Sequence, residues 1–185
     1  MNWTLVAVVV VALFFDFTNG FHDTANSIAT SVSTRALSPR TAVALAAVLN
    51  FAGAFVSIKV AATVAKGIVD PRVITLDVVL AGLVGAITWN LVTWYLALPS
   101  SSSHALIGGV IGSAVAHSGW GVVQWHGLRV KVLEPSLIAP FLGVGLALSI
   151  MFVLMWIIRR QSPARVNWTF RRLQLVSGSF VAFTH

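Results

Sequence analysis

Two short polar stretches interrupt an otherwise apolar sequence, and both carry side chains that can bind ions. The first extends from Gly20 to Asn26 and contains an aspartate, and the second extends from Pro99 to His104 and contains four consecutive serines. Polar and charged groups in apolar surroundings are costly unless they have partners. These stretches are therefore the candidate functional residues of the chain.

Asp23 is the central residue of the first stretch. On a helix, residues at i, i+3, i+4 and i+7 share one face. Four polar residues have this spacing: Asp23, Asn26, Ser27 and Thr30. Such a face would form a wall for a hydrated ion path, with Asp23, Asn26 and the neighbouring His22 and Thr24 as candidate ligands of a coupling cation. For Ser27 and Thr30, simple contacts between helices are an equally open alternative.

The second stretch predicts the start of a helix that could hold an anion. Proline ends an incoming helix, and serine is a favoured N-cap. The free N–H groups and the positive dipole end of the following helix would suit an oxyanion. The candidate substrate ligands are Ser101, Ser102, Ser103 and His104, together with Asn26. The alternative is a capped loop that binds no ligand.

The composition indicates an integral membrane protein. Of the 185 residues, 57% are hydrophobic and only 9% are charged, and the mean hydropathy is +0.89. A soluble domain carries roughly 25% charged residues. The net charge of +7 comes from basic residues that lie between apolar segments, which is typical of membrane topology and argues against nucleic-acid binding. There is no cysteine, and neither a metal site nor a cofactor is predicted.

The apolar segments predict an all-α membrane protein with about five transmembrane or half-membrane helices. Their expected ranges are about 3–34, 41–63, 73–98, 100–116 and 135–158. Breaks are expected at Asn19 and Gly20 in the first segment and at Pro99 after the third. An arginine-rich cytoplasmic loop is expected after residue 158, and Asn50 and Asn90 are expected to form hydrogen bonds between helices.

Two broken helices with polar breaks at membrane depth are typical of secondary transporters. This physical argument favours an anion together with a coupling cation. From another class of protein, an intramembrane serine hydrolase could be built from Ser103, His104 and Asp23. The sequence lacks a Gly-x-Ser-x-Gly elbow, however, and an adjacent Ser-His pair is poorly oriented for proton transfer.

Both stretches resemble signatures of the inorganic phosphate transporter family of phosphate permeases. The segment TNGFHDTANSIATSVSTRALSPRTAV is similar to its first signature, Gly-x-Asn-Asp-x-Ala-Asn, with His22 in place of the first asparagine. The segment LPSSSSHALIGGVIG is similar to the second, Pro-x-Ser-Thr-Thr-His-Ala-Leu-x-Gly, with Ser102 and Ser103 in place of threonines. The hydroxyl groups are kept, and the two signatures occur in the expected order.

The resemblance implies symport of inorganic phosphate, alone or as a divalent-metal complex, with H+ or Na+ across the plasma (inner) membrane. A sulfate or oxyanion permease of the same fold is the alternative. Family members have two inverted repeats, so residues 1–172 would be the first repeat. Residues 173–185, whose FVAFTH is similar to the earlier FFDFTN, would begin a truncated second repeat. The chain would then be a fragment, and its partners would be the lipid bilayer and either a missing second half or another copy.

Overall fold

The computed structural model describes residues 2–65 and 67–184, without the side chains at positions 23, 26, 54, 56–65 and 184. The described residues are helical apart from turns and one isolated β-bridge between Val69 and Val123. The chain divides into two compact units. One contains Met1–Asn26 and Ile58–Leu128, and the other contains Ser27–Ser57 and Arg129–His185.

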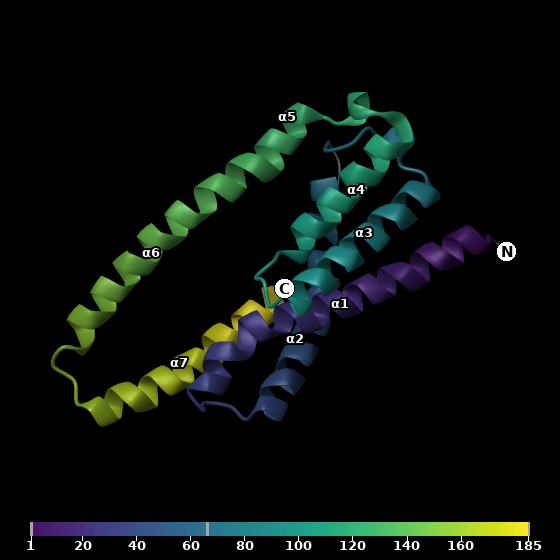
Figure 1. The fold of residues 1–185 in the computed structure, drawn as a ribbon. Helices are drawn as coiled ribbons and strands as arrows, with labels where there is room; N and C mark the ends of the chain where they lie inside the picture. The colour runs from purple at the N-terminus through teal and green to yellow at the C-terminus, as the bar shows by residue number, and fades with distance from the viewer. Residues whose placement is uncertain (1, 66, 185) are drawn as a thin grey trace. The chain divides into compact units, whose positions relative to one another are not determined.

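Six long helices make up most of the described residues, and Figure 1 shows their arrangement within the chain. They are α1 (Trp3–Ser33), α2 (Pro39–Ala65), α3 (Leu76–Tyr95), α4 (Ser102–Ser118), α6 (Glu134–Ile158) and α7 (Pro163–Thr184). Short elements connect them: η1 (Pro71–Val73), η2 (Trp120–Val122), α5 (Trp125–Leu128) and the π-helical turn η3 (Arg129–Leu133). The predicted all-α class is confirmed.

Three helical segments among the described residues are long and apolar enough to cross a membrane. They are Trp3–Ser33, Leu76–Tyr95 and the continuous segment Trp125–Ile158. The chain is therefore a membrane protein. At 17 residues, α4 is shorter than the roughly 20 residues that a full span needs, and crossings by α2 and α4 stay predictions.

The predicted helix break at Asn19 and Gly20 is wrong, because α1 runs without interruption from Trp3 to Ser33. Glycine in a helix costs only about 1 kcal/mol relative to alanine, which packing on either side can offset. Thr18 is completely buried just before this point. The Thr24 hydroxyl donates to the Gly20 carbonyl oxygen one turn later, so the backbone there is hydrogen-bonded rather than open.

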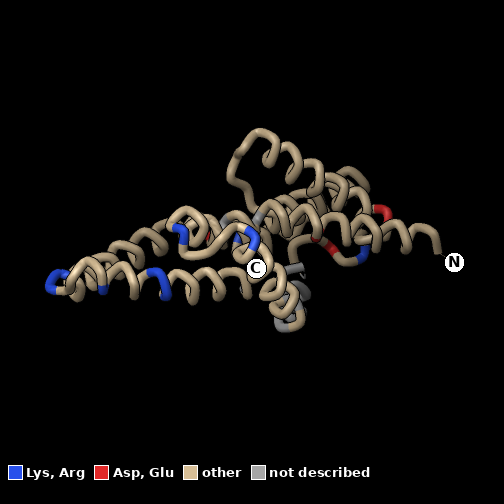
Figure 2. Tube along the Cα trace, turned by 90° about the horizontal axis from the view of Figure 1, so that it is seen from below, with Lys and Arg blue, Asp and Glu red and all other residues tan. Residues whose placement is uncertain are grey.

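The arginine-rich loop is also shorter than predicted, because α7 already begins at Pro163. Proline is well suited to the first position of a helix, and arginine is a good helix former. Three of the five arginines after residue 158 therefore lie on α7: Arg165, Arg171 and Arg172. Figure 2 shows basic residues at the α6–α7 turn and along the start of α7.

In the first unit, the N-terminal part of α1 lies beside α3, and α4 runs back along α3 in the opposite direction (Figure 1). A core cluster joins Phe15 of α1 to Leu83, Ala86 and Ile87 of α3. The two helices of the α3–α4 hairpin approach closely at Gly82 and Gly109, where their backbones touch. Small residues allow this close approach in lipid, and the hairpin fixes the position of the serine run at its tip.

Candidate functional site

The serine run lies at the start of α4, after a tight turn. α3 ends at Tyr95, Ala97 has a left-handed φ of 53°, and α4 begins at Ser102. Ser101 is the N-cap, and its hydroxyl oxygen accepts from the backbone N–H of His104 at 3.4 Å. The same oxygen lies 2.9 Å from Nδ1 of the His104 ring. The N-cap hydroxyl is therefore held from two sides.

An open cavity of about 480 Å³ borders this helix start. Its volume is in the usual range for ligand pockets. It is lined by Gly85 and Trp89 of α3 and by Ser100, Ser101, His104, Ala105, Gly108 and Gly109 of the α4 side. The Trp89 indole Nε1–H donates to the Ser100 hydroxyl oxygen at 3.0 Å. Trp89 and Ser100 were not among the predicted ligands.

The four predicted substrate ligands of the second stretch do not share one surface. Ser101 and His104 line the cavity, whereas Ser102 is only 2% exposed and is buried inside the unit. Ser103 is exposed but does not line the cavity. Because each helical residue turns by about 100°, consecutive serines must point in different directions. The structure thus brings together two of these four residues.

His22 of the first stretch reaches α3 within the same unit. Its ring Nε2 lies 3.4 Å from the hydroxyl oxygen of Thr93. The neighbouring Phe21 meets Trp94 edge to face, with ring centroids 5.5 Å apart. The backbone of Asp23 and Asn26 continues α1, but their side chains lie outside the described part of the structure. Their predicted roles therefore stay predictions.

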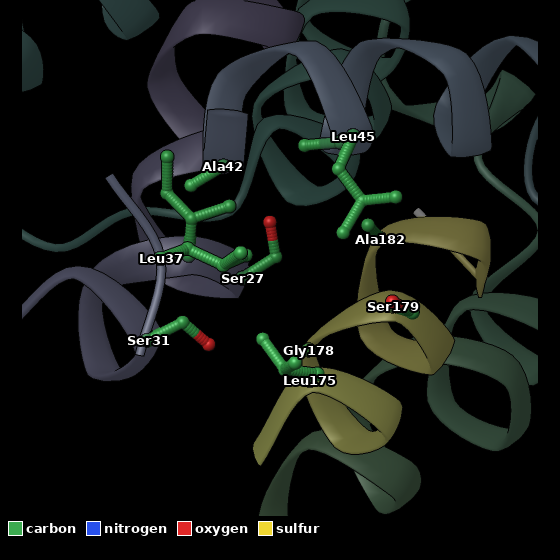
Figure 3. A pocket seen from close by; sticks show the side chains of 11 residues that line it. Ser27, Ser31, Leu37, Ala42, Leu45, Leu175, Gly178, Ser179 and Ala182 are labelled. Carbon is green, nitrogen blue, oxygen red and sulfur yellow. The ribbon is translucent and has the colours of Figure 1, made fainter. Parts of the chain in front are cut away.

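The predicted polar face of α1 does not hold beyond Asn26. Ser27 is buried, but Thr30 is exposed, and Ser31 occupies the next buried position, 3% exposed. In the second unit, Ser27 and Ser31 line a small cavity of about 10 Å³ against α2 and α7 (Figure 3). A β-carbon on Gly178 of α7 would lie 3.3 Å from the Ser31 hydroxyl oxygen. This face therefore serves close packing of α1 on α7.

Three buried polar residues of the first unit were not predicted to belong to a site. Thr18 and Asn90 are completely buried, and Thr93 is 2% exposed. Asn90 was expected to bond between helices, but neither its amide nitrogen nor its amide oxygen has a hydrogen-bond partner among the described residues. That expectation is wrong for Asn90. The described residues also contain no group of three His, Cys, Asp or Glu that could hold a metal ion.

Comparisons with known proteins identify the family that the chain resembles. The phosphate transporter family matches residues 19–169. A Mycobacterium tuberculosis protein, described as a probable low-affinity inorganic phosphate transporter, is 50% identical over 181 residues, which are 98% of this chain and 43% of that protein. A Streptomyces halstedii protein with the same description is 49% identical over 188 residues, covering this whole chain and 87% of that protein.

A solved structure, described as the sodium-dependent phosphate transporter, has the same fold. The TM-score is 0.72 at 22% sequence identity, and the match covers 97% of this chain and 54% of that chain. The chain spans about half the length of the Mycobacterium tuberculosis protein and of this structure. The family match covers both polar stretches and most of the described helices. The chain belongs to the phosphate transporter family.

Proposed function

We propose that the protein moves inorganic phosphate across the plasma membrane together with a cation, by alternating access. Family membership supports phosphate as the substrate. The observation that carries the proposal is the helix start at Ser101, which borders an open cavity together with His104. An enzymatic role for this Ser-His stretch is discarded, because the family consists of transporters.

The start of α4 has the chemistry to bind a phosphate oxygen. The first-turn N–H groups of a helix have no partner within the helix, and the dipole favours negative charge there. Ser100, Ser101 and the His104 ring add hydrogen-bonding groups at the edge of the cavity. Ser102 and Ser103 stay proposed ligands that would require local rearrangement or a change of conformation to reach the same ion. Asn26 also stays a proposed ligand.

Asp23 supplies the coupling in this proposal. An unneutralised carboxylate near the anion site would repel phosphate, so binding of H+ or Na+ to Asp23 would favour phosphate binding. His22 and Thr24 are close in sequence and are proposed to assist. Phosphate could also travel as a complex with a divalent metal, which would reduce the charge that crosses the membrane.

This chain would supply only part of a complete transport site. Many secondary transporters bind their substrate between two inverted repeats. The solved relative matches this fold over 54% of its own chain, which supports one repeat-like half. We propose that a second half, from the same kind of sequence or from another copy of this chain, completes the pathway.

Uptake of radiolabelled phosphate by cells that lack their own phosphate carriers tests the proposal. The protein that carries this sequence should support uptake, and the Asp23→Asn variant should lose the cation-driven part. Asp77→Asn, which changes an exposed carboxylate in the first turn of α3, is the matched control. Cation-driven uptake at the wild-type level in Asp23→Asn would contradict the role of Asp23.

The same assay separates the remaining alternatives for substrate and ion. Excess unlabelled sulfate should leave phosphate uptake unchanged, whereas strong competition would indicate a general oxyanion permease. Replacing sodium by choline at fixed pH, and collapsing the proton gradient at fixed sodium, distinguishes Na+ from H+ coupling.

A further inference from the structure

A layer of buried polar side chains lies inside the first unit. Thr18 of α1 and Asn90 of α3 are 0% exposed, and Thr93 of α3 is 2% exposed. Both polar atoms of the Asn90 amide lack a partner among the described residues. Buried polar groups in native proteins almost always have a partner, so such an exception requires an explanation, for example an ion.

Two contacts place Thr18 and Asn90 on the same stretch of the α1–α3 interface, with Thr93 one turn further along α3. Phe15 of α1 packs into the core cluster with α3, and His22, two turns later, meets Thr93 at 3.4 Å. The two helices therefore run in the same direction along this interface (Figure 1). Thr18 follows Phe15 by one turn, and Asn90 precedes Thr93 by one turn. Both lie between the two contacts and face the interior.

The protons of the two threonines are used by backbone carbonyls of their own helices. The Thr18 hydroxyl donates to the Phe15 carbonyl oxygen at 2.8 Å, and the Thr93 hydroxyl proton is shared by the carbonyl oxygens of Trp89, at 2.8 Å, and Asn90, at 3.1 Å. A hydroxyl has one proton and two lone pairs. Contact with His22 can occupy only one lone pair of Thr93, so each threonine keeps acceptor capacity. The side-chain oxygen of Asn90 is a third acceptor.

Neutral oxygen atoms with no competing protons are suitable ligands for a hard cation. None of the three carries a negative charge, which disfavours a divalent ion because its charge would be left uncompensated. An oxyanion would find few donors here, since only the Asn90 amide nitrogen and, in one tautomer, the His22 ring nitrogen can donate. A monovalent cation is therefore the ligand that this layer suits best.

We propose that Thr18, Asn90 and Thr93 supply oxygen ligands to a binding site for a monovalent cation, with Na+ as the probe. Ser102, next to the N-cap, is also buried in this unit, so the site would lie on the inner side of the hairpin that carries the phosphate-binding cavity. The inference rests on the proposed function, since this cation would be coupled to phosphate in addition to the one proposed at Asp23. It adds three residues that neither polar stretch contains, of which Thr93 contacts His22 of the first stretch.

Thermal unfolding of the purified protein in detergent tests the site directly. The wild-type midpoint should be higher in sodium chloride than in choline chloride of the same ionic strength, because an ion that binds only the folded state stabilises it. Asn90→Leu should lose this sodium-specific increase. Its midpoint in choline should equal or exceed that of the wild type, because an unpartnered amide is replaced by an apolar group of similar size.

The control variant is Asn50→Leu. Asn50 of α2 also has a side-chain oxygen that is buried without a partner, but it belongs to the other unit. It should keep the sodium-specific increase. Thr18→Val, which removes an oxygen without changing the shape, should lose the increase as Asn90→Leu does, and it replaces Asn90→Leu if that variant does not fold.

In uptake assays, Asn90→Leu should raise the sodium concentration for half-maximal phosphate uptake by about tenfold or more, equivalent to about 1.4 kcal/mol of binding free energy. An undiminished sodium shift in Asn90→Leu and Thr18→Val would overturn the site. The site would also be overturned if the wild-type protein transports phosphate but its unfolding midpoint shows no sodium-specific increase. A sodium shift that depends on Asn90, in a protein that does not transport phosphate, would support the site and refute the proposed function instead.

Discussion

Gly82 and Gly109 face each other across the α3–α4 hairpin so closely that a β-carbon on Gly109 would overlap the carbonyl oxygen of Gly82. In the reverse direction, a β-carbon on Gly82 would lie 3.1 Å from backbone atoms of Val110. Neither opposing group is a flexible side chain that could move aside. The hairpin that presents the serine run therefore depends on two positions without a side chain.

Gly109→Ala should separate the two helices and destabilise the protein by about 1–3 kcal/mol, as overpacking does in well-packed interiors. Phosphate uptake should fall with it, because Ser101 would be displaced relative to Trp89. Gly112→Ala is the matched control on the same helix, since no atom lies within 4 Å of its added β-carbon. Unfolding midpoints in detergent compare the two, and equal midpoints would refute the close packing.

Ser101→Ala should destabilise the start of α4 by about 1 kcal/mol, because it removes the N-cap acceptor. It should also weaken phosphate binding, since the His104 ring loses its hydroxyl partner. Ser101→Thr keeps a capping hydroxyl and should restore most of both properties. Ser118→Ala, at the exposed far end of α4, serves as the control for uptake and for the unfolding midpoint. A Ser101→Ala protein with unchanged phosphate affinity would rule out a role in the cavity.

Asp70 gives a pH dependence whose sign can be worked out. The backbone N–H of Arg72 donates to its carboxylate and lowers the pKa of Asp70 below its usual value near 3.8. The stabilising contribution is therefore complete above this usual value and is lost as the pH falls through the lower pKa of the folded state. Hydrogen exchange at the Val73 amide, which donates to the Asp70 carbonyl, should accelerate in that acidic window. Asp70→Asn, which cannot ionise, should not show this acceleration, and parallel profiles for the two proteins would contradict the assignment.

Arg171 stabilises the end of α1 within the second unit. Its guanidinium donates to the Arg35 carbonyl at 3.2 Å and to the Thr34 carbonyl at 3.5 Å. Cations near helix C-termini contribute about 0.3–1 kcal/mol at exposed positions, so Arg171→Ala should lower stability by that amount, and less in high salt. Arg165→Ala removes a contact to Gln161 only and should have a smaller effect. If Arg171→Ala and Arg165→Ala lower the unfolding midpoint equally, the contact of Arg171 with the end of α1 does not stabilise the protein.

Pro99 and Gly20 show which helix breaks can be predicted from sequence. Both were predicted to interrupt a helix, but only the segment around Pro99 does so. Proline removes a backbone donor and collides with the preceding turn, which costs about 3 kcal/mol or more. Glycine costs far less, and the helix continues through Gly20. The sequence alone does not show whether packing offsets this smaller cost.

The sequence predicts which segments form the candidate site, but not which of their side chains face the cavity. The N-cap at Ser101 follows from a serine run after proline, whereas the separate directions of Ser102 and Ser103 depend on where α4 begins. An asparagine inside an apolar span suggests a bond to another helix. That the amide of Asn90 lacks a partner follows only from the three-dimensional packing of α1 and α3.

The indole of Trp89 lines the proposed phosphate cavity and is hydrogen-bonded to Ser100. Trp89 is therefore a natural fluorophore at the proposed substrate site. Its emission should respond when an ion disturbs the bond to Ser100. Subtracting the spectrum of Trp89→Phe isolates this one fluorophore from the seven tryptophans of the chain. Substrate occupancy can then be titrated in solution without any label and without a membrane gradient.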